Sequence, residues 1–318
     1  MNVIAIGDLH FKPKTADENE NAVIEILEII KIIKPRFVVV LGDTLDTHER
    51  INVKTFDKAT KFFKEISEMC ELYIIIGNHD RPNNEIYLTD EHAFNPLKEW
   101  KDTFVVDVPL SKKIDNFNFL FVPYVFRGRF MEAIENINAI QDHKAVFCHQ
   151  EFYGAQMKNY KSKDGDKWPL TYPLVISGHI HTYHIPQENI IYVGSPSDGD
   201  DRRISLFTFT DDSYKFERIK LKYRKRNEIL VTCDNIDTID KSILCDKINS
   251  VTIKGTKEEL KILKKKMASI SKDLVYKTKH VRPNSNVTCN MPFIDKVIDE
   301  IKNDEELMSI LLKVCKVV

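Results

Sequence analysis

Five segments of the sequence place side chains that can bind a metal directly after a short apolar run. They are GDLH (7–10), GDTLD (42–46), GNHD (77–80), CHQ (148–150) and GHIH (178–181). The runs before them have the length and composition of buried strands. Because ligands bind outside the carboxyl ends of the strands in an open α/β sheet, we expect the five segments to converge on one rim.

The segments contain seven candidate metal ligands, which are Asp8, His10, Asp43, Asn78, His149, His179 and His181. Carboxylate, imidazole and amide donors without cysteine suit Mn, Fe or Zn. There are too many donors for one ion, and two neighbouring dications need an anion between them, so we predict two ions that share Asp43. Such a pair clamps a phosphate and makes water acidic enough to attack it, which is phosphate-ester hydrolysis.

A single His or Asp after a strand is more often a cap or a satisfied polar group, but this alternative does not account for five such segments. Their order and spacing resemble the calcineurin-like metallophosphoesterase superfamily, over roughly residues 1–210. The resemblance implies two ligand sets: Asp8, His10, Asp43 and His181 for one ion, and Asp43, Asn78, His149 and His179 for the other.

The resemblance also assigns roles to three residues that are not ligands. His79 is expected to stabilise the transition state or to protonate the leaving oxygen, with Asp80 orienting it. Asp46 stands where SbcD-type nucleases often have His, and we expect it to orient a ligand from outside the coordination sphere.

The elements around these segments alternate between strands and helices in the first part of the chain. Helical spacing covers 21–33 and 53–70, and 204–222 reads as a hairpin that turns at TDDS. The alternation predicts parallel strands, with a mixed sheet further on. The fold class is therefore α/β (α+β): a four-layer metallophosphoesterase β-sandwich flanked by helices, with a small α/β capping domain and a C-terminal helical tail.

Three domains are expected: a nuclease domain (1–225), a basic capping domain that binds DNA (226–283), and a linker with a helical tail (284–318). Residues 1–214 carry 24 basic and 33 acidic side chains, whereas residues 215–282 carry 19 basic and 9 acidic ones. Such asymmetry is typical of a module that binds a polyanion, although a solvated Lys-rich face is an equally good reading of the charge alone. Thr256 and Glu259 form a capping-box pattern before a Lys-rich helix.

The segments HQEFYGAQM and YVGSPSDGDDRRISLFTF are similar to the corresponding stretches of SbcD-type nucleases and their phage relatives. The resemblance implies a two-metal DNA nuclease of recombination or break repair, with manganese the first choice and Fe, Zn or Mg as alternatives. The implied partners are DNA, an SbcC-like coiled-coil ATPase that the helical tail contacts, and a second copy in a homodimer. For the tail, packing on its own domain is an equal alternative.

Two other functions remain open. A small-molecule phosphodiesterase or phosphatase would use the same ions, and a non-catalytic interaction module would need ligands to be missing, which they are not. Six scattered cysteines without a CxxC pair favour reduced thiols and a cytoplasmic location. No apolar run approaches the roughly 20 residues of a membrane span.

Overall fold

The computed structural model describes residues 1–13, 16–48, 50–157, 160–198, 201–222, 226–239, 248–270 and 276–280. The chain divides into two compact units, the N-terminal unit (Met1–Lys225) and the C-terminal unit (Arg226–Val318). The predicted linker and helical tail at 284–318 lie outside the described residues. Of the helices within the described ranges, none is long and apolar enough to cross a membrane.

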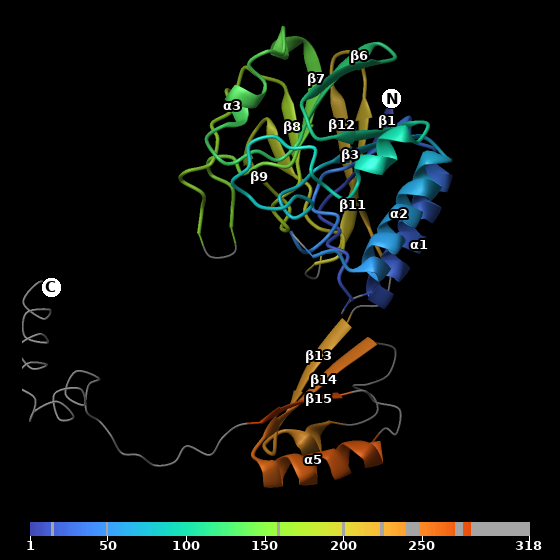
Figure 1. The fold of residues 1–318 in the computed structure, drawn as a ribbon, viewed down its shortest axis with the longest axis vertical. Helices are drawn as coiled ribbons and strands as arrows, with labels where there is room; N and C mark the ends of the chain where they lie inside the picture. Colours follow the sequence, from blue (N-terminus) through green and yellow to red (C-terminus); the bar gives the residue numbers. More distant parts are fainter. Residues whose placement is uncertain are drawn as a thin grey trace, which may run out of the picture. The chain divides into compact units, whose positions relative to one another are not determined.

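Two sheets build the N-terminal unit, and the first contains six of the strands that the structure describes (Figure 1). In spatial order these are β12 (Tyr214–Lys220), β11 (Arg203–Phe209), β1 (Asn2–Ile6), β2 (Phe37–Val40), β3 (Glu71–Ile75) and β4 (Thr103–Val106). β1 to β4 run parallel, as the strand–helix alternation predicts. β11 and β12 form the predicted hairpin, which the Thr210 N–H closes on the Ser213 carbonyl.

The second sheet also contains six described strands. In spatial order these are β5 (Leu110–Ile114), β6 (Phe117–Val122), β7 (His143–Cys148), β8 (Leu174–Ser177), β10 (Ile190–Tyr192) and β9 (His184–Gln187). The four inner strands are parallel, whereas β5 and β9 run antiparallel along the two edges. The expectation of a mixed sheet in this part of the chain is confirmed.

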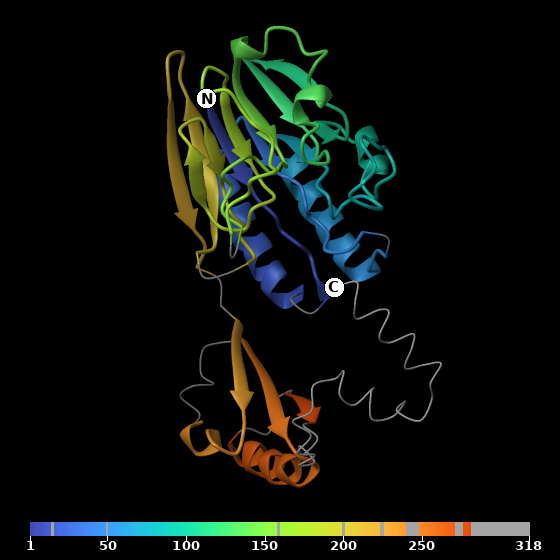
Figure 2. The same ribbon diagram turned by 90° about the vertical axis from the view of Figure 1, so that its left-hand side faces the viewer.

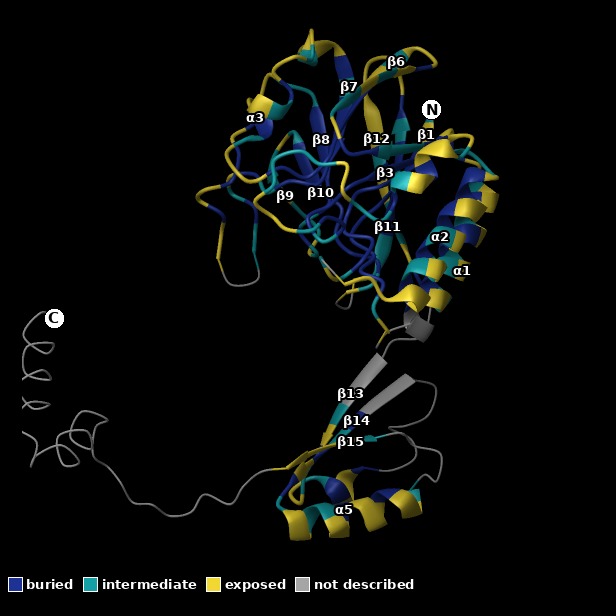
Figure 3. Cartoon of the chain, in the orientation of Figure 1, coloured by how far each residue is buried: buried dark blue, intermediate teal, exposed yellow. Residues whose placement is uncertain are grey.

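The two sheets pack face to face, and their central strands are buried on both sides. In β2, Val39 faces the second sheet, whereas Val38 and Val40 pack toward the helices. Tyr73 of the first sheet stacks on Phe121 of the second at a centroid distance of 4.1 Å. Burial on both faces explains why these strands read as continuous apolar runs, and Figure 3 shows the buried strands at the centre of the unit.

Helices cover the outer faces of the sandwich. α1 (Ala16–Ile33) and α2 (Val53–Ser67) pack on the first sheet, as Figure 2 shows, and the short α3 (Phe130–Ala133) packs on the second. Two 3₁₀ turns, Asn95–Glu99 and Ile140–Asp142, lie in the connections. α1 begins before the predicted residue 21 because its first turn is polar and gives no apolar spacing to detect.

The described residues of the C-terminal unit form a three-stranded parallel sheet with one helix on it. Its elements are β13 (Arg226–Val231), a 3₁₀ turn (Ile236–Thr238), β14 (Ile248–Gly255), α5 (Lys257–Ile270) and β15 (Tyr276–His280). α5 packs Leu263 and Met267 into the apolar cluster of the sheet. The capping box is confirmed, because the Thr256 N–H donates to Glu259 Oε2 at 2.7 Å and the Glu259 N–H donates to Thr256 Oγ1.

Candidate metal centre

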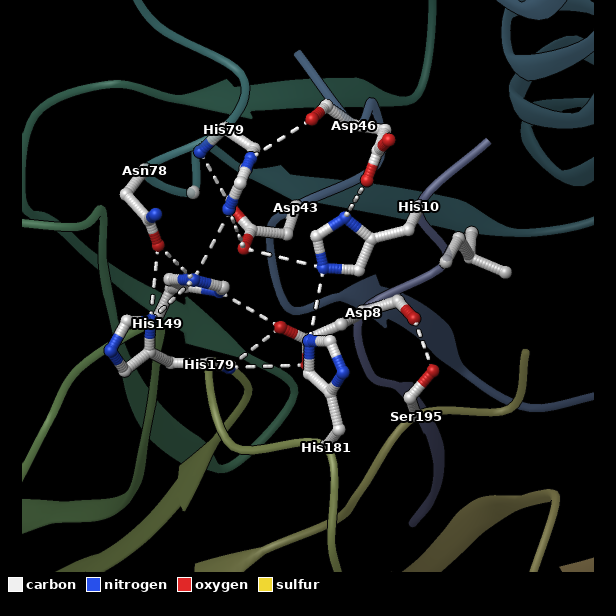
Figure 4. Close-up of polar contacts among 12 residues, drawn as sticks. Asp8, His10, Asp43, Asp46, Asn78, His79, His149, His179, His181 and Ser195 are labelled. Atoms are coloured by element: carbon white, nitrogen blue, oxygen red, sulfur yellow. Dashed lines mark hydrogen bonds and ion pairs between the residues drawn. The ribbon is translucent and has the colours of Figure 1, made fainter. Parts of the chain in front are cut away.

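The seven predicted ligands meet at one edge of the sandwich (Figure 4). Asp8, Asp43 and Asn78 follow β1, β2 and β3 of the first sheet, while His149 and His179 follow β7 and β8 of the second. Because these strands are parallel within each sheet, their carboxyl ends open on the same side. The convergence expected from the five segments is therefore confirmed as geometry.

The turns that carry these side chains are tight, and several have unusual backbone angles. His10, Asp43 and His179 have positive φ values of 43°, 49° and 74°. Residues other than glycine rarely adopt such backbone angles. Gly42 has φ +92°, and a Cβ atom on it would lie 2.5 Å from His149 Nδ1. Strained residues of this kind cluster where the surrounding structure holds a functional site in place.

The first cluster consists of Asp8, His10 and His181, whose donor atoms lie within 4.8 Å of one another. His10 Nε2 and His181 Nε2 are 3.0 Å apart. The other nitrogen of each ring faces a carboxylate: His181 Nδ1 lies 2.7 Å from Asp198 Oδ2, and His10 Nδ1 lies 3.4 Å from Asp46 Oδ1. With both Nδ1 atoms as donors, two Nε2 lone pairs face each other, which requires a cation or a proton between them.

The second cluster consists of Asp43, Asn78, His149 and His179. Asn78 Oδ1 lies 3.0 Å from both His149 Nε2 and His179 Nδ1, and these two nitrogens are 3.2 Å apart. The Nδ1–H of His149 donates to the Leu41 carbonyl at 2.6 Å, so Nε2 is the nitrogen that faces the cluster. Asn78 Oδ1, His149 Nε2 and His179 Nδ1 form a triangle small enough for all three atoms to bind one cation.

Asp43 connects the two clusters. Its Oδ1 lies 3.3 Å from His149 Nε2 in the second cluster, and its Oδ2 lies 3.6 Å from His10 Nε2 in the first. Burial alone would raise the pKa of this carboxyl, but the imidazoles of His149 and His10 hold the pKa well below its usual range. A buried, ionised carboxylate with one oxygen toward each cluster has the position that a bridging ligand needs.

Comparison with known proteins agrees with this geometry. The profile of the calcineurin-like phosphoesterases matches residues 1–183. The chain belongs to this family. It is 40% identical over 216 residues to the provisionally named phosphoesterase 244L of Invertebrate iridescent virus 6, covering 66% of this chain and 76% of that protein. It is 38% identical over 233 residues to the provisionally named phosphoesterase 078R of Invertebrate iridescent virus 3, covering 71% and 67% respectively.

A solved structure, that of protein AQ665 of unknown function from Aquifex aeolicus, is 15% identical. It covers 52% of this chain and 88% of its own, with a TM-score of 0.30, which carries no argument about function. The family membership shows that this protein is a metal-dependent phosphoester hydrolase with the α/β sandwich fold of its family. Members use divalent metal ions, and the donor set of the two clusters fits such ions.

His79 lies at the open side of this phosphoesterase centre, with 31% of its side chain exposed. Its backbone N–H donates to Asp43 Oδ1 at 2.8 Å, and its Nδ1 lies 3.1 Å from the Asp46 carbonyl oxygen. The ring edge that carries Nε2 faces the centre, 4.0 Å from Asp43 Oδ2. The imidazole is therefore held in place while remaining accessible to a substrate.

The predicted orienting contact from Asp80 to His79 needs correction. The Asp80 carboxylate is buried and accepts hydrogen bonds from the backbone N–H groups of Gly77, Thr44 and Leu45. Among the described contacts it makes none with the His79 ring, which the Asp46 carbonyl orients instead. Asp80 thus joins the loop after β2 to the loop after β3, because its carboxylate is the acceptor that these buried N–H groups need.

Three contributors to the centre were not identified from the sequence. Asp198 orients His181, and Ser195 Oγ donates to the Asp8 carbonyl at 2.6 Å. The Tyr124 ring packs near both His179 and His149, at centroid distances of 5.7 and 6.1 Å. The segment SPSD after β10 contains both a hydroxyl and a carboxylate, which is the one signal that could have pointed to Ser195 and Asp198.

Proposed function

We propose that this phosphoesterase is a two-metal DNA nuclease of the SbcD type. The observation that carries the proposal is the pair of ligand clusters joined by one buried carboxylate, Asp43. In this proposal Asp8, His10, Asp43 and His181 hold one ion, and Asp43, Asn78, His149 and His179 hold the other. Two divalent ions bound in this way would neutralise phosphate charge and make water available as a nucleophile near neutral pH.

The residues of the chain then have distinct tasks. Asp43 keeps the two ligand sets at a fixed separation, and the Leu41 carbonyl fixes the tautomer of His149. The accessible His79 would contact the scissile phosphate, where it stabilises the transition state or protonates the leaving oxygen. Asp80 supports this arrangement by holding the backbone on either side of the turn.

A polyanionic substrate is supported by the charge of the C-terminal unit, for which we propose a DNA-binding role. Lys254 of β14 lies opposite Lys279 of β15, and Lys277 lies on the same face two residues away. All three lysines are exposed or nearly so, and none forms an ion pair with a residue in the described ranges. DNA affinity depends largely on cations that neutralise phosphates, so such a face suits DNA.

The decisive experiment is hydrolysis of linear duplex and single-stranded DNA with Mn²⁺. We expect wild-type protein to degrade DNA, and the His79→Ala and His149→Ala variants to lose on the order of 100-fold or more in rate. Lys101→Ala is a matched surface control, since this side chain is 92% exposed and lies outside the centre. Variants that cut as fast as wild type would contradict the site assignment.

The same protein should be assayed with chromogenic phosphomonoesters and cyclic nucleotides. Strong turnover of these compounds without DNA hydrolysis would replace the nuclease proposal by the small-molecule alternative. Replacing Mn²⁺ by Fe²⁺, Zn²⁺ or Mg²⁺ in one assay tests the proposed preference for manganese.

The proposed partners are an SbcC-like coiled-coil ATPase and a second copy of the chain. Both rest on the sequence resemblance, and the helical tail that would contact the ATPase lies outside the described residues. Purification of the full chain from its native source should recover such an ATPase, and removal of residues 284–318 should abolish the association. An ATPase that still binds the shortened chain would contradict the role of the tail.

A further inference from the structure

One buried carboxylate joins two loops on the second sheet, the loop after β6 and the long loop between β7 and β8. Asp166 Oδ2 and Oδ1 accept hydrogen bonds, each 3.0 Å long, from the backbone N–H groups of Gly128 and Phe130 in the loop after β6. Its Oδ2 also accepts from Gln150 Nε2 at 2.7 Å, and its carbonyl oxygen accepts from the Tyr153 N–H at 2.9 Å. The loop after β6 and the loop after β7, which includes residues 160–167, therefore form one connected surface, named here the loop platform.

The loop platform exposes aromatic side chains that the core does not use. Phe126, Tyr153 and Tyr160 are 40%, 54% and 59% exposed. Gly128 and Gly154 follow two of these aromatics closely and have φ values of +84° and +82°. A Cβ on either glycine would meet no close atom, so space does not require glycine at these positions. The positive φ values of the two turns do. The turns hold the aromatic rings at the surface.

Cations accompany these aromatics. The Arg127 guanidinium lies 5.9 Å from the Phe126 ring centroid, and Lys167 Nζ lies 6.0 Å from that of Tyr153. Lys161 and Lys163 are exposed and form no ion pair within the described part of the chain. Cations beside exposed aromatic faces are the combination with which proteins bind the backbone and the bases of single-stranded nucleic acid.

The loop platform begins at the metal centre itself. His149 of the second cluster is four residues before Tyr153 on the same loop. Tyr124, whose ring packs 5.7 Å from that of His179, is two residues before Phe126. Both exposed aromatics therefore belong to loops that also carry residues of the metal centre.

We propose that the loop platform binds unpaired nucleotides, with bases stacked on Phe126 and Tyr153 and with Arg127, Lys161 and Lys167 contacting the phosphates. The inference rests on the proposed nuclease function and specifies its substrate as single-stranded or locally unpaired DNA. Bases within a duplex are already stacked and paired, so they present no free face to an aromatic side chain. The loop platform thus selects for unpaired ends over intact duplex.

The test is equilibrium binding of the metal-loaded full chain to labelled oligonucleotides with phosphorothioate linkages, which resist hydrolysis. The probes are a single strand of about 16 nucleotides, which is the upper range of a single-strand site, an abasic strand of equal length, and a blunt duplex. Because the abasic strand has the same charge but no bases, the difference between the first two probes isolates stacking. We expect the base-bearing strand to bind about five- to 150-fold more tightly for each stacked base.

Substitutions test which aromatic side chains give the base-bearing strand its higher affinity. Tyr153→Ala and Phe126→Ala should each remove the advantage of one stacked base while leaving affinity for the abasic strand unchanged. Tyr153→Phe should retain the advantage, because a phenyl ring stacks without the hydroxyl. Tyr214→Ala is the matched control, since this aromatic is 38% exposed but belongs to β12 of the other sheet. Arg127→Ala should weaken binding of both single strands.

Equal affinity of wild-type protein for the base-bearing and abasic strands would overturn the inference, whatever the variants do. Binding is measured without hydrolysis, so it is independent of the nuclease proposal. If the protein discriminates between these strands but never cuts DNA, the loop-platform proposal stands and the nuclease proposal fails. If the protein cuts DNA but binds both strands equally, the nuclease proposal stands and the loop-platform proposal fails.

Discussion

The two ligand clusters of the centre are built from similar donors but are supported differently. In the second cluster, His149 is fully buried and its ring is fixed by a backbone carbonyl, that of Leu41. In the first cluster, His181 is 32% exposed and its ring is fixed by Asp198, a carboxylate that is itself 54% exposed. The imidazole of His149 is therefore held by the core of the sandwich, and that of His181 by a side chain on a surface loop.

This difference should make the geometry of the second cluster more rigid, and the metal affinity of the first cluster easier to change. A main-chain carbonyl next to β2 moves only if the sheet moves, so the second cluster is preorganised. A carboxylate on a loop orients the histidine that it contacts, but water and salt screen an exposed charge. We expect the second cluster to hold its ion more firmly, and the first cluster to be where affinity responds to substitution.

The largest effect is expected from Asp43→Asn, which removes the charge that both clusters share. Repulsion between two dications would then lack a bridging anion, so both ions should bind more weakly. The rate of phosphodiester hydrolysis should fall by about 1,000-fold or more. Elemental analysis after dialysis should find fewer than two ions per chain. Two retained ions and an unchanged rate would show that Asp43 is not a shared ligand.

His149→Ala and His181→Ala separate the clusters, since each removes one imidazole from one cluster. Each should lose one ion and roughly 100-fold in rate. In metal-free protein, only His149→Ala should lower the free energy of unfolding, by about 1–3 kcal/mol, because it removes the imidazole that most offsets the cost of burying the Asp43 charge. His181→Ala should change it by less than about 0.5 kcal/mol. Chemical denaturation measures both, and equal destabilisation would remove the distinction between the clusters.

The positions of the ligands could be predicted because they depend on local patterns. A short apolar run, then a glycine, then a polar donor identifies the end of a buried strand, and parallel strands bring such ends together. Asp8, Asp43 and Asn78 each follow this logic, and the structure places all three at the same edge. The sandwich core and the hairpin at 204–222 could be read from the same strand patterns.

The supporting contacts could not be predicted, because they depend on how loops fold over the strand ends. The segment SPSD marks Asp198 as a polar side chain after a strand but does not indicate that it reaches His181. Asp80 has the residue type of an orienting carboxylate but binds backbone N–H groups instead. β4 and β13 were not identified from the sequence either. β13 begins with polar residues and pairs only with β14, so alternation gives little signal.

Asp198→Asn tests whether the first cluster depends on its loop carboxylate. An amide can still occupy the place beside His181 Nδ1 but supplies no negative charge, so metal affinity should fall by about 10- to 100-fold at one site only. Titration calorimetry with Mn²⁺ should show one weakened and one unchanged site. Ser197→Ala, a neighbouring change that leaves the carboxylate intact, is the control. If both sites weaken together, the clusters are not independent in the way described.

A further effect, which needs no substitution, is a pH dependence of metal binding. Burial alone would lower the pKa of His149, but the Asp43 and Asp8 carboxylates raise it to about 9 in the metal-free protein, whereas burial and the charge of His149 lower the pKa of His179 to about 3. A metal ion must displace the proton from His149, so affinity at the second cluster should fall about tenfold for each pH unit below 9 and level off above it. Calorimetry in buffers of different ionisation enthalpy should detect this proton release at the second cluster. In Asp198→Asn the release at that cluster should be unchanged, because the carboxylates that raise the pKa of His149 are those of Asp43 and Asp8, and Asp198 is not among them.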